Sequence, residues 1–188
     1  LLPLDIKGKI ALIGPMADAR NNMCGMWSMT CTPSRHGTLL EGIRSAVGDK
    51  AEILYAKGSN IYYDAETEKA AMGIRPLERG DNRQLLDEAL RIAARADVIV
   101  AALGECAEMS GESVSRTSLE IPDAQQDLLK ALVKTGKPVI LLLFTGRPLV
   151  LNWEATNVHS ILNVWFGGSE TGDAVADVLF GRVSPSGK

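Results

Sequence analysis

The clearest signal of the fold is VIVAAL at residues 98–103, and it is matched by VILLLF at residues 139–144. Both runs are almost continuous in aliphatic residues, which is typical of a strand that is buried on both faces rather than on one. Three further runs of strand length share this character, at Ile10–Ile13, Ile53–Ala56 and Ile161–Phe166. Five such runs predict a parallel sheet that is covered on both sides.

Segments with helical periodicity lie between most of these runs. Apolar residues recur at three- and four-residue spacing over 38–47 and 82–96, a third helix is expected from residue 123 to 135, and a fourth over 173–180. The polar stretch 58–80 predicts a long loop with a helical turn near 65–71. Strands that alternate with helices predict an α/β fold, with an open, mainly parallel, doubly wound sheet and helices on both faces.

The composition is that of one packed domain. Of the 188 residues, 46% are hydrophobic and 23% are charged, and 20 basic against 23 acidic side chains give a net charge of −3. Because the basic residues are scattered and the balance is slightly acidic, no nucleic-acid partner is expected. The longest apolar run, residues 139–144, is too short to span a bilayer, so no membrane partner is expected either.

The motifs predict neither a cofactor nor a metal. No G-x-G-x-x-G follows the first strand and no G-x-x-x-x-G-K-[ST] occurs, which disfavours a flavodoxin-like nucleotide binder. The two histidines, His36 and His159, fall in different predicted elements, and no C-x-x-C or H-x-x-x-H spacing brings metal ligands together. Cys24, Cys31 and Cys106 are an odd number, which excludes a complete disulfide framework and leaves any single bridge open.

Trp27 is a candidate ligand-binding residue in the loop over residues 14–37. In an open parallel sheet, ligands bind beyond the carboxyl ends of the strands, and this loop follows the first strand. The indole does not belong to the apolar face of any predicted helix or strand, so it can stack on a sugar ring or a nucleobase. Trp153 and Trp165, in contrast, follow or end apolar runs and are expected in the core.

The loop over residues 104–122 contains four carboxylates, which suggest proton transfer. They are Glu105, Glu108, Glu112 and Glu120. Glu112 stands out because a Ser-Gly pair before it allows backbone freedom, while two serines and an arginine after it can anchor the loop. A merely solvated acidic loop is the alternative interpretation.

A series of short motifs follows in one order along nearly the whole chain. They are IALIGPMAD (10–18), WS (27–28), LYAKG (54–58), GE (104–105), SGE (110–112), SR (115–116), IP (121–122), GRPL (146–149), WFGGSE (165–170), ADVLFG (176–181) and PSGK (185–188). Their order resembles the second, α/β-sandwich domain of glycoside hydrolase family 3, close to its bacterial periplasmic β-glucosidases. The resemblance implies the same fold class as the periodicity does.

The resemblance also implies a function within a larger enzyme. Family members are typically retaining β-glycosidases whose aspartate nucleophile comes from a preceding (β/α)8 barrel, and in many the acid/base glutamate comes from this domain. Residues 1–188 are then one domain, excised from a longer chain without its N-terminal barrel and the rest of its C-terminal region, and inactive alone. The implied partners are a carbohydrate substrate and that barrel, and the implied location is the periplasm or the exterior of a bacterium.

The resemblance assigns roles to particular residues. Glu112 matches the acid/base position, and Glu108 is a reserve candidate because the place of this glutamate shifts among family members. Trp27 falls where relatives have a loop tryptophan near the sugar. Glu105 and Arg147 match motifs that we interpret as structural. Because some members take the acid/base from elsewhere, a noncatalytic structural or sugar-binding module is the alternative function, and the sugar itself stays open.

Overall fold

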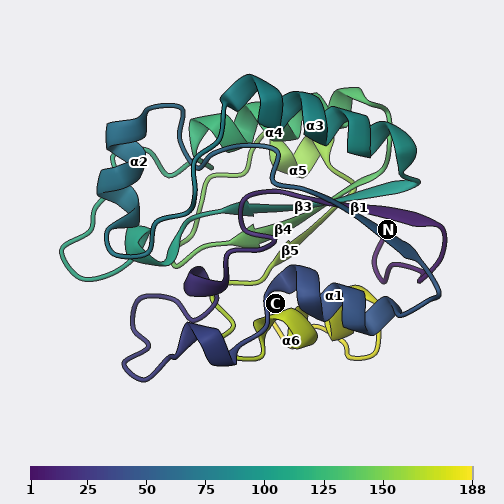
Figure 1. Cartoon of the computed structure of the whole chain (residues 1–188), viewed down its shortest axis with the longest axis horizontal. Helices are drawn as coiled ribbons and strands as arrows, with labels where there is room; N and C mark the ends of the chain where they lie inside the picture. Colours follow the sequence, from purple (N-terminus) through teal and green to yellow (C-terminus); the bar gives the residue numbers. More distant parts are fainter. Residues whose placement is uncertain (188) are drawn as a thin grey trace.

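The computed structural model describes residues 1–187 and shows a parallel sheet between two layers of helices (Figure 1). All five strands are parallel, in the order β2-β1-β3-β4-β5. They are β1 (Lys9–Ile13), β2 (Glu52–Ala56), β3 (Val98–Gly104), β4 (Val139–Phe144) and β5 (Ser160–Asn163). The predicted α/β class, with an open, doubly wound parallel sheet, is confirmed.

Helices cover both faces of the sheet. On one face lie α1 (Leu39–Val47) and α6 (Thr171–Leu179), and on the other α3 (Asn82–Arg95), α4 (Asp123–Lys134) and the short α5 (Glu154–Asn157) (Figure 1). α2 (Ala65–Met72) lies near one end of the sheet, where the helical turn was expected, whereas α5 was not predicted. Within residues 1–187 no helix is both long and apolar enough to cross a membrane.

Side-chain caps explain where two of these helices begin. Thr38 and Glu41 form a capping box at the start of α1: Glu41 N donates to Thr38 Oγ1 at 3.2 Å, and Thr38 N donates to Glu41 Oε2 at 2.9 Å. At the start of α3, Gln84 N donates to the Asp81 carboxylate at 2.9 Å. Each cap satisfies backbone N–H groups that have no partner inside the helix, so the local sequence determines these starts.

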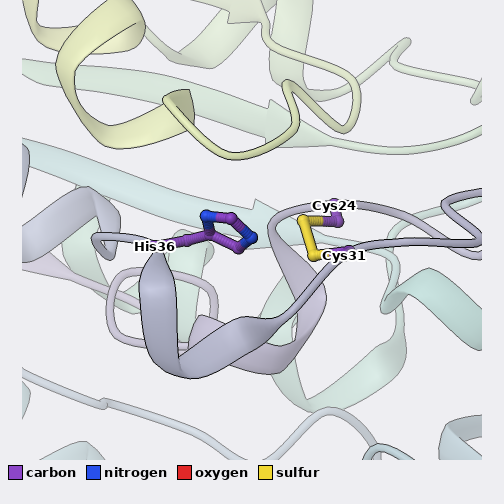
Figure 2. Close-up of side chains that lie close together, drawn as sticks. All are labelled: Cys24, Cys31 and His36. Carbon is purple, nitrogen blue, oxygen red and sulfur yellow. A yellow bond between two sulfur atoms is a disulfide. The ribbon is translucent and has the colours of Figure 1, made fainter.

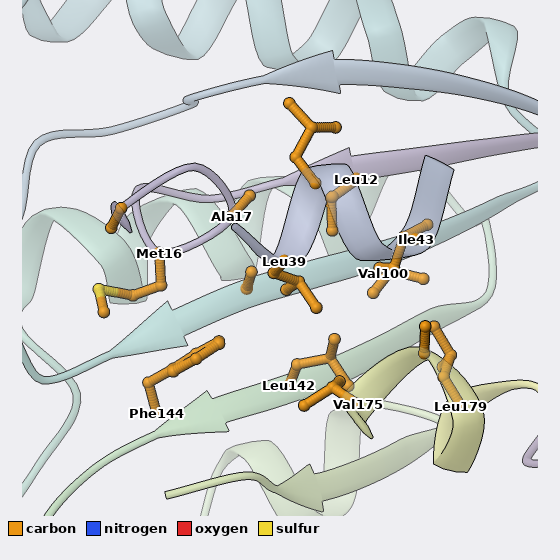
Figure 3. Packing of buried hydrophobic residues seen from close by; sticks show 14 of the residues in the cluster. Leu12, Met16, Ala17, Leu39, Ile43, Val100, Leu142, Phe144, Val175 and Leu179 are labelled. Atoms are coloured by element: carbon orange, nitrogen blue, oxygen red, sulfur yellow. The ribbon is translucent and has the colours of Figure 1, made fainter. Parts of the chain in front are cut away.

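The two faces of the sheet pack into two separate cores. On the α1 and α6 face, Leu12, Val100 and Leu142 from the strands meet Leu39 and Val175 from the helices (Figure 3). Alternate strand residues point to the opposite face and pack against α3 and α4; the set includes Ile13, Ala101, Leu103, Leu141, Ala89, Ala93, Leu128 and Leu132. Every residue of β3 and β4 is buried, which is the physical basis of their continuous apolar sequences.

The neighbouring strands β1 and β3 form a topological switch point. The chain leaves β1 toward α1 on one face and leaves β3 toward α4 on the other, so their connections diverge and open a crevice. Gly14 directly follows β1 and Gly104 is the last residue of β3, and both have a positive φ, of +140° and +133°. A Cβ at either position would collide with a backbone carbonyl of the adjacent strand, that of Ala102 or Phe144. Only glycine fits these strand ends.

The prediction that Trp165 lies in the core is wrong. The edge strand β5 ends at Asn163, the backbone turns at Trp165 with a φ of +52°, and the side chain is 47% exposed. An edge strand has one neighbour only, so an apolar run at its end is not held in the sheet to its last residue. Trp153 is half-buried and packs against the core on the α3 and α4 side.

We predict that Gly104→Ala lowers the free energy of unfolding by about 3 kcal/mol or more, because it adds a backbone collision to the strain of a positive φ. Gly136→Ala is the matched control, since Gly136 also has a positive φ, of +74°, but a Cβ there meets no atom within 4 Å. It should cost about 1 kcal/mol. Urea unfolding of both variants measures the difference, and equal losses would contradict the collision.

Candidate functional site

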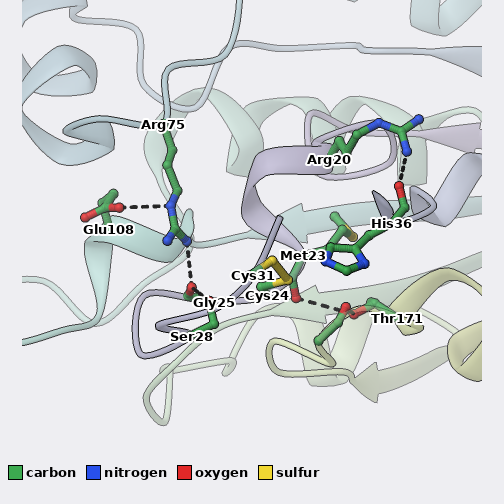
Figure 4. The surroundings of a disulfide bond; sticks show 11 residues. Arg20, Met23, Cys24, Gly25, Ser28, Cys31, His36, Arg75, Glu108 and Thr171 are labelled. Atoms are coloured by element: carbon green, nitrogen blue, oxygen red, sulfur yellow. Dashed lines mark hydrogen bonds and ion pairs between the residues drawn. A yellow bond between two sulfur atoms is a disulfide. The ribbon is translucent and has the colours of Figure 1, made fainter. Parts of the chain in front are cut away.

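Loops from three strands meet at the carboxyl edge of the sheet. Arg75, in the segment after β2, donates from Nη1 to Gly25 O at 2.6 Å, and its Nε lies 3.2 Å from Glu108 Oε1 (Figure 4). Gly25 belongs to the loop after β1, and Glu108 to the loop after β3. One guanidinium group therefore holds together the two long loops that leave the switch point.

The structure brings the Glu112 segment and the Trp27 segment into contact. A Cβ on Gly111 would collide with Met26 Sδ, so the backbone of one loop packs directly against a side chain of the other. Glu112 and Trp27 are the residues that directly follow this pair. Trp27 is 68% exposed. Glu112 is exposed as well, and its carboxylate has no hydrogen-bond or ion-pair partner within residues 1–187.

Glu108, the reserve candidate, is in a different situation. Its side chain is 14% exposed and is paired with Arg75, whose own side chain is 18% exposed. Removing either partner of such a pair leaves a largely buried charge uncompensated. Glu108 therefore links the loops, whereas the Glu112 carboxylate is free to contact another molecule or domain.

Glu105, at the base of the loop that carries Glu112, anchors this loop. Its side chain is completely buried. One carboxylate oxygen, Oε1, accepts from Arg116 Nη1 at 2.9 Å and lies 3.1 Å from Arg147 Nε, while Oε2 accepts from Thr145 Oγ1 at 2.7 Å and from Gly146 N at 3.2 Å. Two cations and two neutral donors compensate the buried charge. This arrangement agrees with the interpretation of Glu105 and Arg147 as structural.

The same two arginines close the loop at both ends. Arg147 Nη2 donates to Met109 O, before Glu112, and Arg116 Nη2 donates to Glu120 O, after it, at 2.8 Å. Ser113, the residue next to Glu112, has a φ of +59°. A non-glycine residue in this region persists only where its surroundings hold it, and such residues gather at functional sites. The anchors leave a short exposed turn with Glu112 on it.

The Trp27 loop is closed by a disulfide between Cys24 and Cys31. The sequence left this pairing open; the signal that could have indicated it is that both cysteines lie in the one loop predicted over residues 14–37. Met23 O, at the base of the loop, accepts from Gly168 N at 3.1 Å and from Thr171 Oγ1 at 3.3 Å (Figure 4). The loop is thus attached to the segment that leads into α6.

Cys106, the remaining cysteine, is a free thiol in the core. Burial raises the pKa of the Cys106 thiol, and the nearby Glu68 and Glu105 carboxylates add to the effect. A thiol that is hard to ionise is a poor nucleophile and a poor metal ligand. Cys106 is therefore a packing residue.

The structure brings His36 close to two cysteines, although no C-x-x-C or H-x-x-x-H spacing links these residues in the sequence. Cys24, Cys31 and His36 place their sulfur and ring nitrogen atoms within 4.8 Å of one another (Figure 2). After Cys31 the chain makes the 3-10 turn η2 (Pro33–Arg35), and Arg20 donates to His36 O, so His36 returns to the cysteines. Helix and strand periodicity do not apply to such a loop, which is why spacing did not predict the cluster.

A hollow of about 420 Å³ lies beside the Glu112 loop, and Tyr62, Arg116 and Asp123 contribute to its lining. Neither Glu112 nor Trp27 lines it. These two side chains instead face outward at the edge of the sheet. In the part of the chain that the structure describes, they form an open surface rather than an enclosed pocket.

The sequence and the architecture are both similar to those of known proteins. The model of the glycosyl hydrolase family 3 C-terminal domain matches residues 1–188. A periplasmic β-glucosidase from Salmonella typhimurium is 45% identical over the whole chain, and a β-xylosidase from Formosa agariphila is 36% identical over the whole chain. The crystal structure of a Listeria innocua β-glucosidase in complex with isofagomine superposes with a TM-score of 0.78 at 32% identity, again over the whole chain.

The chain spans about a quarter of the length of these relatives: 25% of the Salmonella protein, 24% of the Formosa protein and 23% of the Listeria protein. The family model nevertheless extends from the first residue of this chain to the last. The ordered motifs, the parallel sheet and the superposition agree with that match. The chain therefore belongs to glycoside hydrolase family 3, as the C-terminal domain of that family.

Proposed function

We propose that this chain supplies the acid/base residue, Glu112, of a retaining β-glycosidase that removes terminal β-linked sugars. The observation that carries the proposal is the free carboxylate of Glu112, exposed on a turn that buried ion pairs hold beside the switch point. Relatives described as β-glucosidases and a β-xylosidase support a glucoside or a xyloside as the substrate.

Retaining hydrolysis needs two carboxyl groups about 5 to 5.5 Å apart. One attacks the anomeric carbon, while the other first protonates the leaving oxygen and then deprotonates water. Glu105 and Glu108 are held in ion pairs, and Glu120 accepts a hydrogen bond from Gln126, so among the carboxylates of this loop Glu112 suits the second role best. The nucleophile then comes from another domain, the barrel that precedes this domain in the family. Residues 1–188 alone are expected to be inactive.

A domain interface suits this division of labour. When the barrel and the sugar cover the exposed turn, they exclude water from around Glu112. Loss of water favours the neutral, proton-donating form of a carboxyl group, as an acid catalyst requires. The anchors at Glu105 keep the turn in place while its tip meets the substrate, so little ordering is needed on binding.

Trp27 is proposed as an aromatic wall of the same site. Its segment packs on the Glu112 segment through Met26 and Gly111, and its indole is exposed. A flat apolar ring with one polar edge is well suited to stacking on a sugar. We propose that the indole of Trp27 stacks on the leaving group, which is the sugar or other group released when the glycosidic bond breaks.

The alternative function is a noncatalytic structural or sugar-binding module. The observation in its favour is that two tryptophans on loops at the carboxyl ends of the strands, Trp27 and Trp165, are both exposed and offer apolar surface. Such a surface can bind a sugar or a neighbouring domain without any proton transfer. The two functions differ in whether hydrolysis depends on the Glu112 carboxylate.

The periplasm or the cell exterior is the proposed location. The Cys24–Cys31 disulfide supports it, because disulfides persist in oxidising compartments. The Salmonella relative is named as periplasmic.

In the complete enzyme, we predict that Glu112→Ala lowers kcat/KM for substrates with poor leaving groups by about 10²- to 10⁴-fold, because these groups need protonation. Glycosylation by dinitrophenyl glycosides should be nearly unchanged, since that leaving group needs no acid. Turnover should still slow at the second step, and azide, which needs no base, should restore it and yield a β-glycosyl azide. Steady-state and burst kinetics with product analysis measure these effects.

Glu120→Ala is the matched control, because Glu120 is an exposed carboxylate on the same loop. It should leave all of these rates within about twofold, as for a surface substitution without a catalytic role. If Glu112→Ala left hydrolysis of unactivated substrates intact, or if Glu108→Ala alone showed the full pattern with azide rescue, the assignment of Glu112 would be wrong.

For Trp27→Ala we expect KM for aryl β-glycosides to rise about three- to tenfold, which corresponds to the loss of one aromatic stacking contact. Met29→Ala is the control, since Met29 lies in the same disulfide-closed loop and is 93% exposed. It should leave KM unchanged. Initial-rate measurements on the two variants decide the matter, and an unchanged KM for Trp27→Ala would exclude the stacking contact.

A further inference from the structure

His36 has a buried ring nitrogen with nothing to bind. Nε2 is shielded from solvent, and no hydrogen-bond partner for it exists among residues 1–187. Buried polar atoms in folded proteins almost always have a partner, so an orphan ring nitrogen needs an explanation. The imidazole faces the Cys24–Cys31 disulfide (Figure 2), and the three potential ligand atoms lie within 4.8 Å of one another.

Two sulfurs and one imidazole nitrogen are a donor set for zinc. With Zn–S bonds of about 2.3 Å and Zn–N bonds of about 2.0 Å, ligand atoms around a tetrahedral ion lie roughly 3.5 to 3.8 Å apart. The atoms of this cluster are within that reach once the sulfurs separate. The Cα atoms of Cys24 and Cys31 are 6.4 Å apart, which leaves room for an ion between two cysteine side chains without a large backbone shift.

We propose that Cys24, Cys31 and His36 form a zinc site once the disulfide between the two cysteines is reduced. A dithiol reductant delivers two electrons and two protons to the disulfide, which becomes two thiols, while the reductant becomes its own disulfide. Zn²⁺ then displaces one proton from each thiol and binds both thiolates together with Nε2 of the neutral His36. Three protein ligands leave the fourth position to water.

Contacts other than the disulfide hold the three ligands in place. Met23 O accepts from Thr171 and Gly168 on one side of the loop, and Arg75 donates to Gly25 O on the other (Figure 4). Arg20 holds the backbone of His36 and is paired with Glu41. The cluster therefore keeps its arrangement when the sulfur–sulfur bond is broken. Either the disulfide or a zinc ion can therefore crosslink the loop that presents Trp27.

The proposal does not depend on Glu112 or on any catalytic role. The test uses the full-length protein, reduced without oxygen by a phosphine that is then removed, with Co²⁺ as the spectroscopic probe for Zn²⁺. We expect one Co²⁺ to bind at this site, with the intense visible bands of four-coordinate cobalt and a near-ultraviolet thiolate charge-transfer band. Zn²⁺ should abolish both, and the oxidised protein should show neither.

Variants assign the signal to this cluster. Cys24→Ser, Cys31→Ser and His36→Ala should each weaken Co²⁺ binding at least about tenfold, since each removes a direct ligand. Cys106→Ser is the matched control and should leave the signal intact, because that thiol lies in the core. In the reduced wild-type protein, Zn²⁺ should raise Tm, and it should not do so in Cys24→Ser.

Three results would overturn the proposal. The first is a reduced wild-type protein that keeps its far-ultraviolet circular dichroism but shows no cobalt–thiolate band. The second is a His36→Ala variant that binds Co²⁺ as tightly as the wild type. The third is a protein that unfolds on reduction whether or not Zn²⁺ is present, because the ligands are then not held together.

Discussion

The buried carboxylate of Glu105 is the interaction on which the exposed site depends. A charge without access to water is tolerated only when cations and hydrogen-bond donors surround it, and here Arg116, Arg147, Thr145 and Gly146 do so. Because Glu105 directly follows β3 and Thr145 directly follows β4, the register of the two central strands sets the position of the cluster. The register of β3 and β4 therefore also sets the position of the turn that carries Glu112.

The sheet topology decides which loops can meet. β1 and β3 are neighbours whose connections leave toward opposite faces, so their loops border one crevice although about ninety residues separate the strands. Arg75 then joins the two loops through Gly25 O and Glu108, and Met26 packs on Gly111. The candidate site is thus a product of strand order first and of a few polar contacts second.

The chemistry of Glu112 and Trp27 explains why the candidate site is exposed to solvent. An unpaired carboxylate and an indole cost little at a surface in contact with water, whereas both would be costly to bury without partners. Glu105 and Glu108 show the opposite solution, in which each acid has a cation beside it. The difference in pairing, rather than in residue type, separates the structural glutamates from the one proposed for catalysis.

The layered fold could be predicted from the sequence. Runs such as 98–103 and 139–144 are apolar throughout because their strands are buried on both faces, and a capping box and a strand-end glycine act over a few residues. The ordered motifs likewise indicated the family, which the comparisons confirm, and the roles of Glu112 and Trp27 stay predictions.

The arrangement of the loops at the carboxyl ends of the strands became apparent only in three dimensions. It paired Cys24 with Cys31 and brought His36 to them, it turned Trp165 out of the core, and it gave Glu108 a partner in Arg75. Loops have no periodicity that a sequence pattern can reveal. Their contacts join residues from different strand connections, and these contacts follow from the path of the backbone around the sheet.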